Sequence, residues 1–394
     1  MMRIAMVGPF GLHPNKTMQS RALGLARPLT RSGHEICIFM PPWQTPDEAD
    51  RHWQEDGVQM RYIPLSGGTP GIAWRLLRET LAWQPDIVHC FKPKAYSGMV
   101  GWWLWQFQRH KLPLVMDTDD WEGWGGWNEL APYSTVQKHF FAWQEQWGMA
   151  HCHLLTTASR ELQAIALHQG IPDAQIAYIP NGPGIAHDQP PSEADILAKR
   201  VELGLEQRPT LLLYSRLFEF DVQRLVDVLV GVQTAVPDLA ILTIGTGLYE
   251  DNAAALRTLL TEANLLTAVV DVGWVELDRL PLLLSCADVG LYLMDDTLLN
   301  RTKCPVKLAD MAAMGVPVVG EAVGQVTEYV VNGRTGSLRP SGATADLAQD
   351  IIILLQNPEL RHQFSQAARN HIQTHFSWQN LAQQLEKEYA IIAA

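Results

Sequence analysis

Residues 300–336 read NRTKCPVKLADMAAMGVPVVGEAVGQVTEYVVNGRTG, and this stretch decides the fold class. Helical spacing through Lys307 and Asp310 is followed by the apolar strand pattern VPVV, and a glycine turn at Gly324 then opens a further helix. Helix, buried strand and helix in this order are typical of a parallel sheet with helices on its faces.

The same alternation of short apolar runs and longer amphipathic runs extends through nearly the whole chain. Strands are expected at 3–7, 35–40, 87–91, 114–117, 154–157 and 176–179, and again at 210–214, 240–244, 269–272, 289–293 and 317–319. Helical patterns such as 20–31 and 159–168 lie between them, and roughly the last 50 residues read as helices only. This pattern predicts an α/β protein with two Rossmann-like domains.

Turn-forming residues mark the boundary between the two predicted domains. Pro-Asn-Gly-Pro at 180–183 is followed by Asp-Gln-Pro-Pro-Ser at 188–192, where the periodicity stops. We therefore predict a first domain at 1–183 and a second at 184–375. The amphipathic residues 376–394 are predicted to form a helix that crosses back onto the first domain.

Composition excludes several classes of function. The 394 residues carry a net charge of −12, which disfavours nucleic-acid binding. Five scattered cysteines without C-x-x-C spacing predict neither a disulfide framework nor a zinc site. No apolar run approaches membrane-spanning length, and the N-terminal residues lack a leader pattern. These features predict a cytoplasmic protein.

Ligands of open parallel sheets bind where strands end and helices begin, so the residues after each strand are candidates. Gly11 lies in a flexible loop after the first strand, although G-x-G-x-x-G is absent. Gly245 and Gly247 form a turn that permits close approach of a nucleotide, a weak signal because any tight turn favours glycine. Arg216 follows the strand at 210–214 and could bind a diphosphate, with a surface ion pair as the alternative.

The stretch quoted first adds three candidates. Asp310 lies on a predicted helix where a carboxylate can bridge two ribose hydroxyls, and Lys307 is on the same helical face with a charge for phosphate. Glu328 follows the Gly324 turn and has an alternative role as an N-terminal helix residue that meets the dipole.

Taken together, these motifs resemble retaining glycosyltransferases of the group 1 type, glycosyltransferase family 4 with the GT-B fold. The resemblance covers essentially the whole chain. It rests on the glycine-containing first loop, Ile-Pro-Asn-Gly at 179–182, Ser-Arg-Leu at 215–217, Gly-Thr-Gly at 245–247 and KLADMA to GVPVV at 307–319. The resemblance implies two parallel sheets that face each other across a cleft, and a nucleotide diphosphate sugar as co-substrate, with no further cofactor and no metal.

The resemblance also exposes departures from the family pattern. Two acidic residues eight apart flank the donor in that family; Asp310 matches the second, but Thr302 stands where the first is expected. The family's lysine five residues after Arg216 is Asp221 here, so Lys307 or Lys303 would have to supply that charge. In the family a glutamate at the place of Glu328 lines the donor pocket. The nucleotide end of the pocket is therefore better defined than the sugar end.

Candidates in the first half end strands at 87–91 and 114–117. Asp119 stands where many relatives have a histidine, and we expect it to orient an acceptor hydroxyl or to back the reacting sugar. Asp117 and Asp120 are expected to cap the following loop; a metal site of the D-x-D type suits a different fold. His89 and Lys92 are acceptor-side candidates, although a histidine there can equally be a buried structural residue.

Twelve of the 14 tryptophans precede Gly148, and Trp121 is the acceptor-side candidate among them. Packing of helices and loops explains such an excess, and a surface for a sugar or lipid acceptor is the alternative. The latter would agree with peripheral membrane contact at the inner face of the membrane. The overall prediction is transfer of a sugar to an acceptor hydroxyl of a sugar, glycan or lipid-linked molecule. A nucleotide-sugar 2-epimerase and a non-catalytic sugar-nucleotide or glycan-binding protein are the alternatives.

Overall fold

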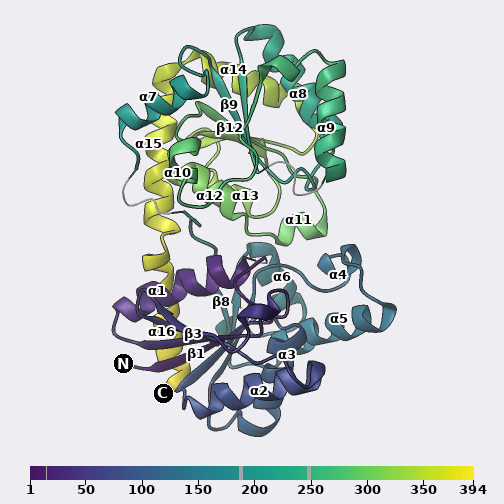
Figure 1. Ribbon diagram of the computed structural model, residues 1–394, viewed down its shortest axis with the longest axis vertical. Coiled ribbons are helices and arrows are strands. Elements are labelled where there is room, and N and C mark those ends of the chain that lie inside the picture. Colours follow the sequence, from purple (N-terminus) through teal and green to yellow (C-terminus); the bar gives the residue numbers. More distant parts are fainter. Residues whose placement is uncertain (15, 186–189, 246–249) are drawn as a thin grey trace. The chain divides into compact units, whose positions relative to one another are not determined.

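The computed structural model describes residues 1–14, 16–185, 190–245 and 250–394. These residues form two compact units (Figure 1). Unit 1 comprises Met1–Gly182, Arg301–Cys304 and Trp378–Ala394, and unit 2 comprises Pro183–Asn300 and Pro305–Ser377. The division falls one residue before the predicted boundary, and the C-terminal segment joins unit 1. Arg301–Cys304 also join unit 1, whereas the prediction placed all of 184–375 in the second domain.

The described residues of unit 1 form one eight-stranded sheet in the order β3-β4-β2-β1-β5-β6-β7-β8. Every neighbouring pair is parallel except β3 and β4. The strands are β1 (Arg3–Val7), β2 (Glu35–Met40), β3 (His52–Glu55), β4 (Val58–Tyr62), β5 (Ile87–Phe91), β6 (Leu114–Thr118), β7 (Leu154–Thr157) and β8 (Ile176–Tyr178).

Helices cover this sheet. A short π-helix at Met18–Ala22 leads into α1. The α-helices of unit 1 are α1 (Leu23–Arg31), α2 (Gly68–Ala82), α3 (Ala95–Gln108), α4 (Trp127–Leu130), α5 (Thr135–Ala150), α6 (Arg160–His168) and α16 (Trp378–Ala393). Short 3₁₀ turns lie at Pro46–Glu48 and Asp173–Gln175.

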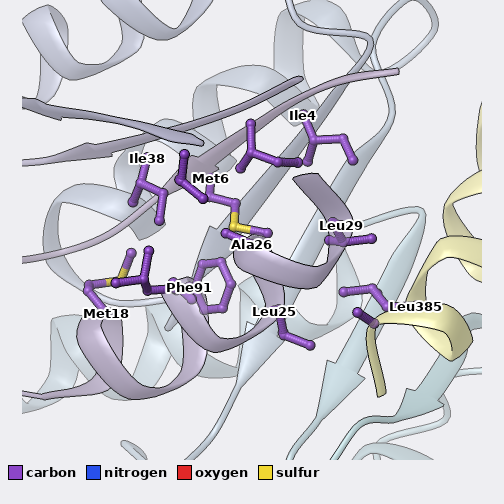
Figure 2. Close-up of a cluster of buried hydrophobic side chains, with 14 of the residues drawn as sticks. Ile4, Met6, Met18, Leu25, Ala26, Leu29, Ile38, Phe91 and Leu385 are labelled. Atoms are coloured by element: carbon purple, nitrogen blue, oxygen red, sulfur yellow. The ribbon is translucent and has the colours of Figure 1, made fainter. Parts of the chain in front are cut away.

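The core of unit 1 is formed by α1, the central strands and α16. Figure 2 shows Met6 of β1 next to Ala26 of α1, whereas Leu25 points to the other side of that helix, away from β1. Leu385 of α16 lies beside α1, near Leu29. Gly24 permits the contact between the two helices, because a Cβ there would lie 2.6 Å from the Trp378 ring. The last helix therefore completes the core of the first domain rather than lying on its surface.

Unit 2 contains a second parallel sheet, in the order β11-β10-β9-β12-β13-β14 within its described residues. Its strands are β9 (Thr210–Tyr214), β10 (Ala240–Ile244), β11 (Val269–Asp271), β12 (Val289–Tyr292), β13 (Val318–Glu321) and β14 (Gly336–Arg339). Its helices are α7 (Glu193–Glu202), α8 (Val222–Ala235), α9 (Glu250–Glu262), α10 (Leu280–Leu284), α11 (Leu298–Thr302), α12 (Val306–Ala313), α13 (Val326–Tyr329), α14 (Thr344–Gln356) and α15 (Pro358–His375), with a 3₁₀ turn at Leu266–Ala268; the end of α11 belongs to unit 1.

The predicted strands all form, and three others were not predicted. Among these, β3 and β4 are joined by Asp56-Gly57, both with positive φ, so an Asp-Gly hairpin signal was present in the sequence. Polar side chains in HWQE and VQMRY hid the strand pattern. The third, β14, is only four residues long. Among the described residues, no helix is long and apolar enough to span a membrane.

Candidate functional site

The Ser-Arg-Leu turn after β9 holds Arg216 at the carboxyl edge of the sheet of unit 2. Leu217 has φ +64°, a left-handed conformation that is strained for a branched residue. Its amide donates to Ser215 Oγ (3.0 Å), and its carbonyl accepts from Asn252 Nδ2 (2.8 Å). Arg216 is half-buried, and among the described residues its guanidinium has no hydrogen bond or ion pair. The fixed turn thus presents an uncommitted cation.

Two further predicted residues lie close to this turn. Lys307 Nζ is 4.7 Å from the centroid of the Tyr214 ring, the last residue of β9. Gly245, with φ +73°, follows β10, and a Cβ there would come within 4.0 Å of both Lys307 Nζ and Tyr214 Cε2. The ends of β9 and β10 and the start of α12 therefore converge on one place. Gly247 lies outside the described residues.

Asp310 is almost fully buried and already engaged. Its Oδ1 accepts hydrogen bonds from the amides of Gly184 (2.7 Å) and Ile185 (3.3 Å), and the Tyr214 hydroxyl is a further partner. Burial raises the pKa of Asp310 to about 7, although these hydrogen bonds and Lys307 act in the opposite direction. The carboxylate predicted to bind ribose thus anchors the start of unit 2 in the described structure.

Asp221 and Glu328 have local structural explanations. Asp221, at the position of the family lysine, caps α8 by accepting from the Gln223 amide (2.9 Å), a role that a lysine side chain cannot perform. Glu328 is half-buried in the first turn of α13, and its carbonyl oxygen lies 2.8 Å from His371 Nε2. Tyr214 was not singled out from the sequence, although its position at a strand end was a signal.

Thr302 has no exposed surface, and the segment around it is held within unit 1. Ser159 Oγ donates to the Thr302 carbonyl (2.8 Å). Asn181 donates through Nδ2 to the Cys304 carbonyl (3.0 Å) and through its amide to Cys304 Sγ (3.1 Å). A carboxylate at position 302 would be costly in this buried setting. As described, Thr302 offers a donor sugar no accessible surface.

Lys92 is the centre of a charged cluster at the ends of β5 and β6. Its Nζ lies 2.8 Å from Asp119, 3.3 Å from Asp120 and 3.1 Å from Glu122, and the residue has φ +55°. Burial lowers the pKa of Lys92, but the three carboxylates outweigh it and hold that pKa well above its usual range. Asp119 and Lys92, both predicted candidates, are therefore brought together as an ion pair.

Glu145 of α5 is a buried carboxyl that the sequence did not single out. Its Oε1 accepts from Thr118 Oγ1 (3.1 Å), and its Oε2 has no hydrogen-bond partner among the described residues. Burial, together with the charge of Glu122, raises the pKa of Glu145 to about 8. The side chain is therefore largely protonated at neutral pH.

Asp117 was expected to cap the following loop, but in the structure its carboxylate pairs with Arg21 instead. Arg21 Nε and Nη2 donate to its carboxylate at 2.8 and 2.6 Å, and both residues are buried. Arg21 Nη1 also donates to Asn181 Oδ1 (3.0 Å), and Thr156 Oγ1 donates to Asp117 (2.6 Å). With Asp117 on Arg21 and Asp119 on Lys92, the two acids of the D-x-D pattern serve separate ion pairs.

The remaining first-half candidates are buried. His89 has no exposed surface, lies 2.6 Å from the Tyr389 hydroxyl through Nδ1, and has a pKa lowered by burial and by Arg21. This agrees with the structural alternative for His89. Trp121 is 6% exposed and donates through Nε1 to the Trp124 carbonyl (2.7 Å). Gly11 lies against Tyr62. A Cβ at position 11 would come within 3.1 Å of the Tyr62 hydroxyl, so the lack of a side chain lets the loop pass this residue.

Two family models match the chain. The model described as "Glycosyl transferase 4-like domain" matches residues 16–182, and the model "Glycosyl transferases group 1" matches residues 195–371. A phosphatidyl-myo-inositol mannosyltransferase of Mycobacterium leprae is 23% identical, with 100% of this chain and 97% of the relative covered. A GDP-mannose-dependent alpha-(1-6)-phosphatidylinositol monomannoside mannosyltransferase of Mycolicibacterium smegmatis is 25% identical over 88% of this chain and 87% of the relative.

Solved structures share the fold over the full length. Sucrose-phosphate synthase from Thermosynechococcus elongatus superposes with a TM-score of 0.75 at 20% identity, covering 100% of this chain and 99% of that one. The Anabaena protein HepE in complex with UDP and glucose has a TM-score of 0.75 at 17% identity, covering 99% and 100%. Because the two family models together match most of the chain, it belongs to the group 1 glycosyltransferases, glycosyltransferase family 4, and the solved structures show that its fold is GT-B.

Proposed function

We propose that this glycosyltransferase moves a sugar from a nucleotide diphosphate sugar to an acceptor hydroxyl, with retention of configuration and without a metal. The observation that carries the proposal is the group at the carboxyl edge of the sheet of unit 2. Arg216, Lys307 and Gly245 meet there around Tyr214, and the Arg216 guanidinium has no partner among the described residues. Two cations beside a glycine turn suit a diphosphate.

The diphosphate is the leaving group, so charge develops on it as the bond to the sugar breaks. Arg216 and Lys307 would stabilise that charge. Because the charge is larger in the transition state than in the bound donor, this stabilisation would lower the barrier. The departing phosphate oxygen would take the proton of the attacking hydroxyl on the same face of the sugar. The new glycosidic bond would then keep the configuration of the old one, and no protein nucleophile is required.

Asp310 is proposed to bind the ribose. This role requires its carboxylate to exchange at least one of its hydrogen bonds with Gly184 and Ile185 for ribose hydroxyls. Glu328 is proposed to line the same pocket. Thr302 is buried, so it would affect the donor only indirectly, by positioning the residues next to it in the chain.

The acceptor is proposed to bind unit 1, with Asp119 and Lys92 as the charged pair nearest the chemistry. The names of the two mannosyltransferase relatives specify phosphatidylinositol compounds, which favours an acceptor carried on a lipid. The cytoplasm, at the inner face of the membrane, is the location that we propose for such an enzyme.

The direct test incubates the purified chain with GDP-mannose, UDP-glucose and UDP-N-acetylglucosamine, each with and without a mixed lipid and glycan extract. Release of nucleotide diphosphate that depends on the extract supports transfer. Isomerised donor formed without extract would instead support an epimerase, and donor binding without turnover a binding protein. NMR of the first product reports the anomeric configuration, and unchanged turnover in EDTA is expected of a metal-independent enzyme.

A further inference from the structure

Unit 1 exposes large aromatic side chains on three of its helices. Trp74 of α2 is 56% exposed, Trp102 and Phe107 of α3 are 39% and 62% exposed, and Phe140 and Trp143 of α5 are 41% and 45% exposed. We call these five residues the aromatic surface. Tryptophan and phenylalanine are costly to leave in water at such exposure, so a set on neighbouring helices indicates a contact with something else.

Ring contacts join the three helices. Trp74 lies against Trp103 (6.4 Å between centroids), and Trp103 lies against Phe107 (5.1 Å). On the other side of α3, ring contacts run from Trp105 through His151, Trp147 and Trp143 to Phe140 on α5. Helices α2, α3 and α5 also lie together in Figure 1. The exposed rings thus form two groups on three neighbouring helices, and Trp74, Trp102 and Phe107 belong to one of them, joined through Trp103.

Charge separates this region from the rest of the chain. Helix α3 contains no charged residue. Across α2, α3, α5 and residues 109–111, Arg75, Arg78, Arg109, Lys111 and Lys138 face only two acids, Glu79 and Glu145, a balance of five minus two. Glu145 is buried and has a raised pKa, so it adds little negative charge. A local excess of cations within a chain of net charge −12 complements an anionic partner.

We propose that the aromatic surface docks the protein on an anionic phospholipid bilayer. Tryptophan inserts at the boundary between head groups and acyl chains, where both its ring and its polar N–H are accommodated, and phenylalanine adds apolar area at the same depth. The flanking cations, of which Arg78 and Lys111 are exposed, bind the anionic head groups. A protein partner would require a matching shape, whereas a bilayer requires only exposed rings and positive charge.

Docking would bring the enzyme to an acceptor carried in the membrane, and only this consequence rests on the proposed function. The binding itself requires neither donor nor acceptor. It is therefore measured without either, and its failure would leave the transfer reaction untouched.

The experiment is flotation of the full chain with large unilamellar vesicles of phosphatidylcholine containing about 30% phosphatidylglycerol. The variant Trp74→Ser/Phe107→Ser removes two exposed rings. Trp274→Ser is the matched control, because Trp274 is 54% exposed but lies in unit 2. We expect the double variant to lose affinity about tenfold or more and the control to retain it. Circular dichroism and thermal unfolding verify that every variant is folded.

A second pair of variants tests the charge. Arg78→Glu/Lys111→Glu should weaken binding about tenfold or more, whereas Arg257→Glu/Arg334→Glu on exposed residues of unit 2 should weaken it much less. Vesicles of phosphatidylcholine alone, or added salt, should reduce binding by wild type. Equal binding by wild type and folded aromatic variants would overturn the proposal. A dimer in solution that the same variants convert to monomer would also overturn it, because a second copy would then cover the surface.

Discussion

At the scale of single residues, Arg216 has the sharpest consequence. Replacing it by alanine removes a charge-assisted bond to the diphosphate while leaving the Ser215–Leu217 hydrogen bond in place. We expect kcat/KM to fall roughly 10- to 150-fold, equivalent to about 1.5 to 3 kcal/mol. Arg257→Ala, at an exposed arginine of unit 2, should leave it unchanged. Turnover of the Arg216 variant within a factor of about two of wild type would refute the phosphate role.

Glu145 predicts a dependence of stability on pH. Its pKa of about 8 in the folded protein exceeds the usual 4.5, so between these values the folded state holds a proton that the unfolded state has lost. The contribution of that proton to the free energy of unfolding is therefore largest below about pH 4.5. It decreases as the pH rises and is lost once the pH has passed through about 8. Glu145→Gln keeps the acceptor for Thr118 but cannot ionise, so its stability should not fall in this way.

The measurement is chemical unfolding at pH 6 and pH 9, followed by tryptophan fluorescence. Thirteen of the 14 tryptophans belong to unit 1, so the signal reports the unit that contains Glu145. Relative to wild type, Glu145→Gln should gain about 2 to 3 kcal/mol between the two pH values, since one pKa unit is worth about 1.4 kcal/mol. Glu206→Gln, at an exposed residue of unit 2, should show no such gain.

At the scale of elements, the Arg21–Asp117 pair joins the π-helix before α1 to the end of β6. Both side chains are 1% exposed or less, so removing one partner leaves an unpaired buried charge. Asp117→Leu and Arg21→Met should each destabilise unit 1 by about 3 to 5 kcal/mol. The double variant should be destabilised by clearly less than the sum. Additive losses in the same unfolding experiment would show that the pair is not coupled.

The same scale explains which elements were predictable. Strands such as β1 and β9 are continuous apolar runs and were predicted at their observed bounds, because burial on both faces of a parallel sheet imposes that composition. The hairpin β3–β4 was missed because its exposed edge tolerates polar residues. The helix expected at 20–31 begins instead as a π-helix at Met18, a local geometry without a pattern of its own.

At the scale of the whole molecule, we expect amide hydrogen exchange in the two units to respond differently to a donor nucleotide. Arg216, Lys307 and Gly245 all belong to unit 2, so a nucleoside diphosphate without sugar should slow amide hydrogen exchange around residues 214–217 and 306–310. The sheet of unit 1 should exchange at an unchanged rate. Equal protection of both units, or protection confined to unit 1, would contradict the assignment of the nucleotide to unit 2.

The sequence by itself determined the two-domain α/β class, eleven of the described strands to within two residues at either end, and the turn that carries Arg216. These features depend on local pattern, since periodicity and turn chemistry act over a few residues. Only the tertiary structure decided that Arg21 pairs with Asp117, that Asp310 binds the amides of Gly184 and Ile185, and that Thr302 is buried in unit 1. In each case the partner lies about 100 or more residues away in the chain, and a pattern along the sequence carries no record of which distant groups share a buried space.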